Sequence, residues 1–280
     1  MFSMSSIRLS SEISRPALAS VLGALLLVME VPQLQAADSS AELAKKLSNP
    51  VASLISVPLQ GNYDQNLGPS NDGERYTLNV QPVIPVSISS DWNLISRTIL
   101  PLVKQDDVVP GSSQEGIGDV VQSVFLSPKA PTANGWIWGA GPVFLLRTAS
   151  DKYLGSEKWG AGPTAVLLRQ SHGWTYGVLA NQIWSYAGDD DRSDVNATFL
   201  QPFLSFTTAH YTTLGLNTES TYDWEAERWN TPLNLTVAQL FKVGGQPMQL
   251  QLGVRRWLES PRYGAEGWGV RLAYTLMFPK

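Results

Sequence analysis

The sequence predicts an all-β fold: a transmembrane antiparallel β-barrel of about twelve strands. Three observations support this prediction. Apolar and polar residues alternate with a period of two over most of the chain, which is typical of strands. Short and long connections alternate between these segments, as they do in barrels whose turns face opposite sides of a membrane. Tryptophans lie near the ends of the segments and are scarce in their middles.

The composition suits a membrane protein and gives no support to nucleic-acid binding. The 280 residues are 43% hydrophobic and 16% charged, with a formal net charge of −4. Soluble domains usually contain about 25% charged residues. No basic run is present, so nucleic acid is not an expected partner. The chain contains no cysteine, which excludes disulfides and cysteine-ligated zinc.

Residues 1–36 have the pattern of a cleaved signal peptide. Arg8 and Arg15 precede the apolar run "PALASVLGALLLVM" at 16–29, and Leu34–Ala36 offers a cleavage site. The apolar run is shorter than the roughly 20 residues that a spanning helix needs. No later run approaches that length, so an exported chain of this kind is either soluble or a β-barrel.

The remaining chain divides into residues 37–50, a short N-terminal periplasmic helix or plug segment, and residues 51–280, the barrel. "DSSAELAKKL" at 38–47 is the only plausible helix, and it ends before Asn49 and Pro50. The twelve expected strands are 51–63, 74–87, 92–104, 118–128, 136–148, 159–170, 174–187, 195–207, 211–222, 229–241, 247–258 and 267–278. Alternation is weak in the third and fourth strands, so their inward and outward faces are not assigned with the others.

The connections predict the orientation of the barrel. Tight turns follow even-numbered strands, at 88–91, 171–173, 208–210 and 243–246. Longer polar loops follow odd-numbered strands, at 64–73, 105–118, 150–158, 188–194 and 259–267, although the connection at 223–228 is shorter. We expect the tight turns to face the periplasm and the long loops to face outward.

Tryptophans at strand ends predict two aromatic girdles at the levels of the lipid headgroups. The expected girdle residues are Trp92, Trp136, Trp138, Trp159, Trp174, Trp184, Trp229 and Trp268, with Trp224 nearby.

The motif "WGAGP" occurs twice, at Trp138–Pro142 and Trp159–Pro163, at the head of two successive strands. Alternation points its two glycines into the lumen and its proline toward lipid. Because proline cannot donate a ladder hydrogen bond, we expect local bulges at the strand prolines. These are Pro58, Pro82, Pro85, Pro101, Pro142, Pro163, Pro202 and Pro232.

Long phrases of the sequence resemble the exported outer-membrane family labelled as phenol meta-pathway (MetA) proteins, some of whose members carry the name neuromedin U. The phrases are "NPVASLISVPLQGNYD", "YTLNVQPVIPVS", "DWNLISRTILP", "GIGDVVQSVFLSPKAP", "WIWGAGPVFLL", "LGSEKWGAGPTAVLL" and "NTESTYDWEAERW". The resemblance covers essentially the whole mature chain and implies a transporter or channel in the outer membrane of Gram-negative bacteria. It implies no catalytic or ligand-binding residue.

The last strand also resembles the recognition signal of outer-membrane assembly substrates. Gly269, Leu272, Tyr274, Leu276 and Phe278 have the spacing of that signal, although "PK" follows the final aromatic residue. Expected partners are therefore the barrel assembly machinery, outer-membrane lipid and lipopolysaccharide, and an unidentified small solute.

Catalysis and metal binding are the less favoured interpretations, and no cofactor is expected. The two histidines, His172 and His210, lie in predicted periplasmic turns, and Ser171 beside His172 is a poor arrangement for a catalytic triad. The acidic run Asp189–Asp191 could attract divalent cations, but its spacing matches no known ligand pattern, so a solvated loop is favoured.

Polar groups on the predicted inner faces are the main functional candidates. They are Arg97, Arg147, Asn181, Gln201, Asn217, Glu219, Gln249, Gln251, Arg255 and Arg271. They could line a pore for passive passage of small solutes, including aromatic or other organic compounds. They could instead form a hydrogen-bonded network inside a non-conducting barrel that binds a ligand or serves the envelope structurally. An outer-membrane lipid hydrolase and a soluble sandwich are the remaining alternatives.

Overall fold

The structure, a computed structural model, describes residues 37–279, and the predicted signal peptide lies outside this range. One helix, α2 (Ala37–Leu47), precedes fifteen strand segments in a single sheet. The segments are β1 (Ile55–Leu67), β2 (Gly73–Val80), β3 (Val83–Ser87), β4 (Trp92–Asp106), β5 (Ser113–Ile117), β6 (Val120–Pro128), β7 (Trp136–Leu146), β8 (Lys158–Ser171), β9 (Trp174–Gly188), β10 (Asn196–Thr207), β11 (Thr212–Thr218), β12 (Ser220–Asp223), β13 (Arg228–Val243), β14 (Gln246–Glu259) and β15 (Trp268–Phe278). No helix in the described range is long and apolar enough to cross a membrane.

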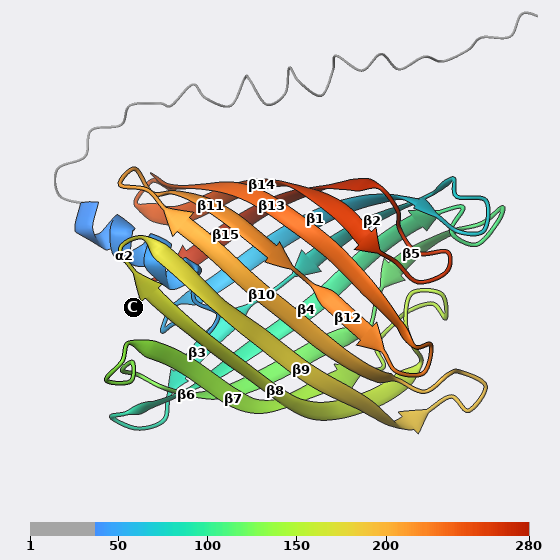
Figure 1. The fold of residues 1–280 in the computed structure, drawn as a ribbon, viewed down its shortest axis with the longest axis horizontal. Coiled ribbons are helices and arrows are strands. Elements are labelled where there is room, and N and C mark those ends of the chain that lie inside the picture. The colour runs from blue at the N-terminus through green and yellow to red at the C-terminus, as the bar shows by residue number, and fades with distance from the viewer. Residues whose placement is uncertain (1–36, 280) are drawn as a thin grey trace, which may run out of the picture. The chain divides into compact units, whose positions relative to one another are not determined.

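The sheet closes on itself into a barrel of twelve antiparallel strands (Figure 1). Three barrel strands are each split into two segments: β2 with β3, β5 with β6, and β11 with β12. The last strand pairs with the first in continuous register, from Ile55 opposite Phe278 to Tyr63 opposite Val270. Closure leaves no unpaired edge, which is the condition for strands to cross lipid. The prediction of a twelve-stranded antiparallel barrel is confirmed.

The two faces of the wall differ in chemistry as the alternation predicts. On β15, the side chain of Leu272 is 51% exposed on the outer face, whereas its neighbour Arg271 is only 3% exposed inside the barrel. Leu235 on β13 likewise points outward, next to the fully buried Asn234. An apolar outer face with polar groups inside is the pattern of a barrel in lipid.

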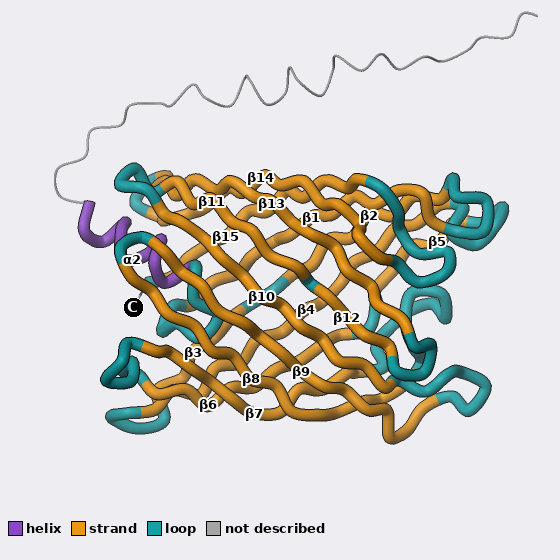
Figure 2. The backbone as a smooth tube through the Cα atoms, in the orientation of Figure 1, coloured by secondary structure: helices purple, strands orange, loops and turns teal. Residues whose placement is uncertain are grey.

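The connections gather at two ends of the barrel (Figure 2). Tight turns join β8 to β9 and β13 to β14, where His172, Gly173, Gly244 and Gly245 all have positive φ. Two successive residues with positive φ match the right-handed twist of the flanking strands in a two-residue hairpin. Helix α2 and the C-terminus lie at this same end, which is the periplasmic end in the predicted orientation (Figure 1).

Most strand prolines coincide with an interruption of the ladder. Pro82 lies between β2 and β3 and is not within a strand, and the backbone of Pro58 faces this break. Pro101 faces the break between β5 and β6, Pro202 faces that between β11 and β12, and a register shift precedes Pro232. The missing donors are therefore absorbed at local irregularities, as expected. Pro85 is an exception, because its pairing with β4 is regular.

The two copies of "WGAGP" have the same local structure. Pro142 and Pro163 lie opposite each other on β7 and β8, and each interrupts the ladder to its other neighbour strand. The preceding glycine is required at both places, because a Cβ on Gly141 or Gly162 would overlap the carbonyl oxygen of Val124 or Gln182. Proline has no N–H to donate to the neighbouring strand at these positions. The glycine before it leaves room for the carbonyl group of that strand to lie close to the motif.

This close approach predicts that alanine at either glycine is destabilising. We expect Gly162→Ala to lower the free energy of unfolding by roughly 1–3 kcal/mol, because the neighbouring backbone must shift. Gly61→Ala on β1 is the matched control, since its Cβ would meet only the carbonyl oxygen of Leu272 at 3.6 Å. Urea titration of folded and unfolded electrophoretic forms compares the two variants. Equal stability of the two would contradict this account of the motif.

The N-terminal segment enters the barrel before the first strand. The first barrel strand begins at Ile55, not at residue 51 as predicted, because residues 51–54 run inside the lumen. Leu43, Ala44 and Leu54 pack against Leu240 of β13 and Met277 of β15. Val51 packs on the far side of the lumen, against residues of β4, β6, β8 and β9. We call residues 38–54 the plug, since its contacts join opposite walls.

Candidate pore and its inner wall

A chamber of about 280 Å³ lies inside the barrel next to the plug. Residues Lys46–Pro50, Ala52 and Leu54 of the plug form one side. The rest is lined by strand residues on both sides of the barrel, from β3 and β4 round to β14 and β15. Its size suits a small organic molecule and is at the lower limit of common ligand sites, which begin near 300 Å³.

The lining combines amides, one guanidinium and an apolar wall. Five of the residues predicted to face the lumen line this chamber: Arg97, Gln201, Asn217, Gln249 and Gln251. Gln81 of the β2–β3 break joins them. Leu54, Val83, Leu179 and Phe203 supply apolar surface in the same space. The chamber therefore offers both hydrogen-bond donors and hydrocarbon to a solute.

A second group of inner side chains forms an ion cluster, which we define as Asp64, Glu219, Arg255 and Arg271. Glu219 receives two parallel hydrogen bonds from Arg271, at 2.9 and 2.8 Å, and lies 3.8 Å from Arg255. Arg255 Nη1 donates to Asp64 at 3.1 Å. Paired geometry of this kind gives strong and directional contacts. The strand order places the cluster on the long-loop side of the chamber, while the plug lies on the tight-turn side.

The split of β11 from β12 places Glu219 in this cluster. Glu219 is the single residue between the two segments, opposite the stretch of β10 that contains Pro202. The irregularity caused by the proline therefore coincides with the position of the carboxylate. Arg271 also donates to Asn62 at 2.8 Å, which connects the cluster to β1.

Sequence reasoning missed several members of this inner network. Asp64 was placed in a loop, because the first strand was predicted to end at residue 63, but β1 continues to Leu67. Trp257 was not assigned to either face, and its indole nitrogen donates to Asp64 at 2.9 Å while its ring lies under Arg255. Arg75 also faces inward, and its Nε donates to Gln105 at 2.9 Å. The available signal was the period of two: Asp64 lies two residues after Asn62, and Trp257 lies two residues after Arg255, so each pair shares a face of its strand.

Two predicted lumen residues belong neither to the chamber lining nor to the ion cluster. Arg147 follows β7 and lies in the loop that leads to β8, where it faces Glu157 at 3.5 Å. It therefore lies at the outer mouth and does not contact the chamber. Asn181 lies on the inner face of β9, two residues beyond Leu179 and opposite the buried Thr164.

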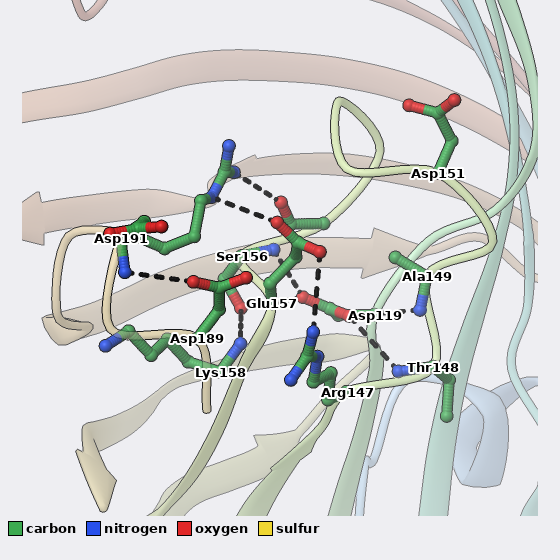
Figure 3. Close-up of polar contacts among 12 residues, drawn as sticks. Asp119, Arg147, Thr148, Ala149, Asp151, Ser156, Glu157, Lys158, Asp189 and Asp191 are labelled. Carbon is green, nitrogen blue, oxygen red and sulfur yellow. Dashed lines mark hydrogen bonds and ion pairs between the residues drawn. The ribbon is translucent and has the colours of Figure 1, made fainter. Parts of the chain in front are cut away.

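The outer mouth is organised around Asp119, at the break between β5 and β6 (Figure 3). Its carboxylate accepts hydrogen bonds from the backbone of Thr148, Ala149 and Ser156. Glu157 bridges Arg147 and Arg192, which connects two neighbouring loops (Figure 3). These contacts order the loop 147–157 over the wall.

A further ion pair connects the next loop to β8. A hydrogen bond from Lys158 holds the pKa of Asp194 below its ordinary value, with help from the hydroxyl of Ser185. Carboxylates on several loops, those of Asp119, Glu157 and Asp194, therefore connect the loops at the mouth to one another and to the wall.

The predicted tryptophans occur in two groups at opposite ends of the strands. Trp92, Trp136, Trp138 and Trp174 lie at the end with the tight turns, where Trp92 packs edge-on against Trp138. Trp159, Trp184, Trp229 and Trp268 lie toward the loop end, where Tyr222 contacts both Trp224 and Trp229. Several of them are exposed on the outer surface, as rings at a lipid–water boundary would be.

The two histidines lie at the tight-turn end. Ser171 Oγ and His172 Nδ1 are 2.7 Å apart, so the two neighbours do share a hydrogen bond. Both side chains are exposed in the turn. In the run Asp189–Asp191, the carboxylate of Asp189 accepts a hydrogen bond from the backbone of Asp191. Within residues 37–279, no group of three or more histidine, aspartate or glutamate side chains has an arrangement suited to a metal ion.

Comparison with known proteins gives a likeness of structure only. No protein-family model matches the chain, and no curated protein matches it. The COG4313 outer membrane channel from Pseudomonas putida F1 superposes with a TM-score of 0.64 and 15% identity, over 81% of this chain and 96% of that one. The chain has the fold of a bacterial outer-membrane β-barrel. The outer membrane is accordingly its location.

Weaker likenesses also involve outer-membrane barrels. Outer membrane phospholipase A from Escherichia coli has a TM-score of 0.44 and 10% identity, over 86% of this chain and 98% of that one. OprB from Pseudomonas putida has a TM-score of 0.34 and 9% identity, over 90% of this chain and 100% of that one. Neither likeness is close enough to bear on activity.

Proposed function

We propose that the chain is a passive outer-membrane channel for small organic solutes, occluded on its periplasmic side by its own plug. The observation that carries the proposal is the solute-sized chamber inside the wall, bounded by residues 46–54. A barrel of twelve strands exceeds the roughly eight whose interior side chains just fill. The likeness to a solved outer membrane channel supports the same interpretation.

The plug is held in a way that favours movement over permanent closure. Hydrogen bonds between the plug and the wall include one from Gln170 to the carbonyl of Lys45 and one from Asn93 to Ser53. Leu54 and Val51 add apolar packing, which has no fixed direction and can be remade at a new position.

The proposal also covers what lies around the barrel. Membership of the MetA family is inferred from the resemblance of the sequence phrases. The apolar outer face and the tryptophan groups support contact with outer-membrane lipid and lipopolysaccharide. The inward and outward alternation of β15 supports delivery by the barrel assembly machinery.

Planar-bilayer conductance of the purified protein tests the channel. We expect small, infrequent steps from the intact chain and larger, frequent steps after deletion of residues 38–54, because the deletion removes the side chains that join opposite walls. Heat-modifiable migration on gels verifies that both proteins are folded barrels. Absence of steps from both folded proteins would favour the second candidate, a non-conducting ligand-binding or structural barrel, for which the cross-lumen packing of the plug is the supporting observation.

A further inference from the structure

We propose that the chamber selects organic anions, with Arg97 binding the carboxylate of a solute whose apolar body lies against the hydrocarbon part of the wall. This inference rests on the proposed channel function and names its substrate class. It is carried by the different environments of the inner arginines.

Arg97 is the arginine that lines the chamber, and it has donors to spare. A guanidinium has five N–H donors. In the described part of the chain, Arg97 makes one side-chain hydrogen bond, from Nη2 to Gln81 Oε1 at 3.3 Å, and no ion pair. Arg255 and Arg271, in contrast, are both engaged by carboxylates of the ion cluster. The guanidinium of Arg97 lines the chamber, so its remaining donors are within reach of a solute there.

The charge around the chamber also favours an anion. Four arginines face the interior in this region, Arg75, Arg97, Arg255 and Arg271, against the two carboxylates Asp64 and Glu219. The carboxylate of Glu219 attracts Arg97 electrostatically, but it is already bonded twice to Arg271. The local excess of positive charge therefore remains uncompensated by protein groups. Inner charges of one sign set selectivity in pores.

The apolar part of the lining suits the rest of an organic solute. Val83, Leu179 and Phe203 supply hydrocarbon, and the side chains of Leu54 and Ala52 continue it onto the plug. Inorganic ions would gain nothing from this surface, whereas a monocarboxylate with a ring or short chain would use both parts. The amides of Gln249 and Gln251 can donate to a second oxygen of the same solute.

Binding to the solubilised full chain tests this inference without relying on conductance. Equilibrium dialysis would compare benzoate with benzamide, which has nearly the same shape but no charge. We expect benzoate to bind the wild type more tightly than benzamide, and Arg97→Gln to weaken benzoate binding by about tenfold or more, the usual effect of losing a charge-assisted contact. Arg97→Lys should retain part of the binding, because it keeps the charge.

Arg147→Gln is the matched control, since Arg147 lies at the outer mouth and its loss removes the same charge from the chain. It should leave benzoate binding unchanged. Heat-modifiable migration identifies any variant that does not fold. If Arg97→Gln does not fold, Arg97→Lys tests the inference in its place, and unchanged benzoate binding in that variant would count against a role of the guanidinium. Equal binding of benzoate and benzamide, or unchanged benzoate binding in folded Arg97→Gln, would overturn the inference. If benzoate binds through Arg97 but neither the intact chain nor the chain lacking residues 38–54 conducts, the binding site stands and the channel proposal fails.

Discussion

Glu219→Ala is expected to lower the free energy of unfolding of the barrel by about 3–5 kcal/mol, the usual cost of removing one partner from a buried ion pair. The carboxylate of Glu219 accepts two hydrogen bonds from Arg271 and also neutralises Arg255. Both arginines are buried, at 3% and 7% exposure. Without Glu219, Arg271 keeps its hydrogen bond to Asn62 but has no carboxylate partner, and Asp64 of the ion cluster remains bonded to Arg255.

Within residues 37–279, Arg255 already has one buried donor without a partner, which makes the ion cluster sensitive to the loss of a carboxylate. Arg255 Nε is buried and has no hydrogen-bond partner among the described residues. The matched control is Glu157→Ala, which removes a carboxylate that also contacts two arginines but at the outer mouth, at 3.5 and 3.7 Å. Exposed pairs contribute about 0–1 kcal/mol. Urea titration monitored by electrophoretic mobility gives both values. A loss for Glu219→Ala no greater than that for Glu157→Ala would contradict a structural role for the cluster.

Cross-linking the plug to the wall is expected to reduce solute passage several-fold, and reduction should restore it. Ser53 on the plug and Asn93 on β4 approach to 2.6 Å between Oγ and Nδ2. The chain has no cysteine of its own, so a Ser53→Cys/Asn93→Cys variant would carry a single possible disulfide. The oxidised form holds residues 51–54 against β4, and passage that depends on their displacement must then fall.

Proteoliposome uptake of a small organic solute, before and after dithiothreitol, measures this effect. The single variants Ser53→Cys and Asn93→Cys are the controls and should respond to neither oxidation nor reduction. Mobility on non-reducing gels after cleavage in the loop 68–72, which lies between positions 53 and 93, establishes that the cross-link has formed. Identical uptake by the oxidised and reduced double variant would show that solutes pass beside a stationary plug.

The third and fourth barrel strands show where pattern reasoning reached its limit. Alternation is weak there because inward residues are apolar: Ile95 on β4 and Phe125 on β6 are completely buried. They are apolar because Val51 of the plug packs against them. A pattern that assumes a wet lumen cannot assign such strands, since their inner surface is the core between wall and plug.

Asp64 and Trp257 illustrate a related limit. Asp64 alternates with Asn62 on β1, and Trp257 alternates with Arg255, which was assigned to the lumen. Asp64 was missed because aspartate next to a polar loop is a normal strand end. Its partners, Arg255 and Trp257, lie 191 and 193 residues away along the chain. Contacts over such separations are made by barrel closure and leave no local signal.

The sequence by itself determined the class of fold, the number of strands, the position of most turns and the groups of tryptophans, because each depends on period, spacing or residue type within a short window. Only the tertiary structure decided that residues 51–54 belong to the plug, that Glu219 lies where a proline-linked break places it among arginines, and that Arg97 is left with free donors. These properties depend on which strands become neighbours when the sheet closes, and closure joins residues that local pattern treats independently.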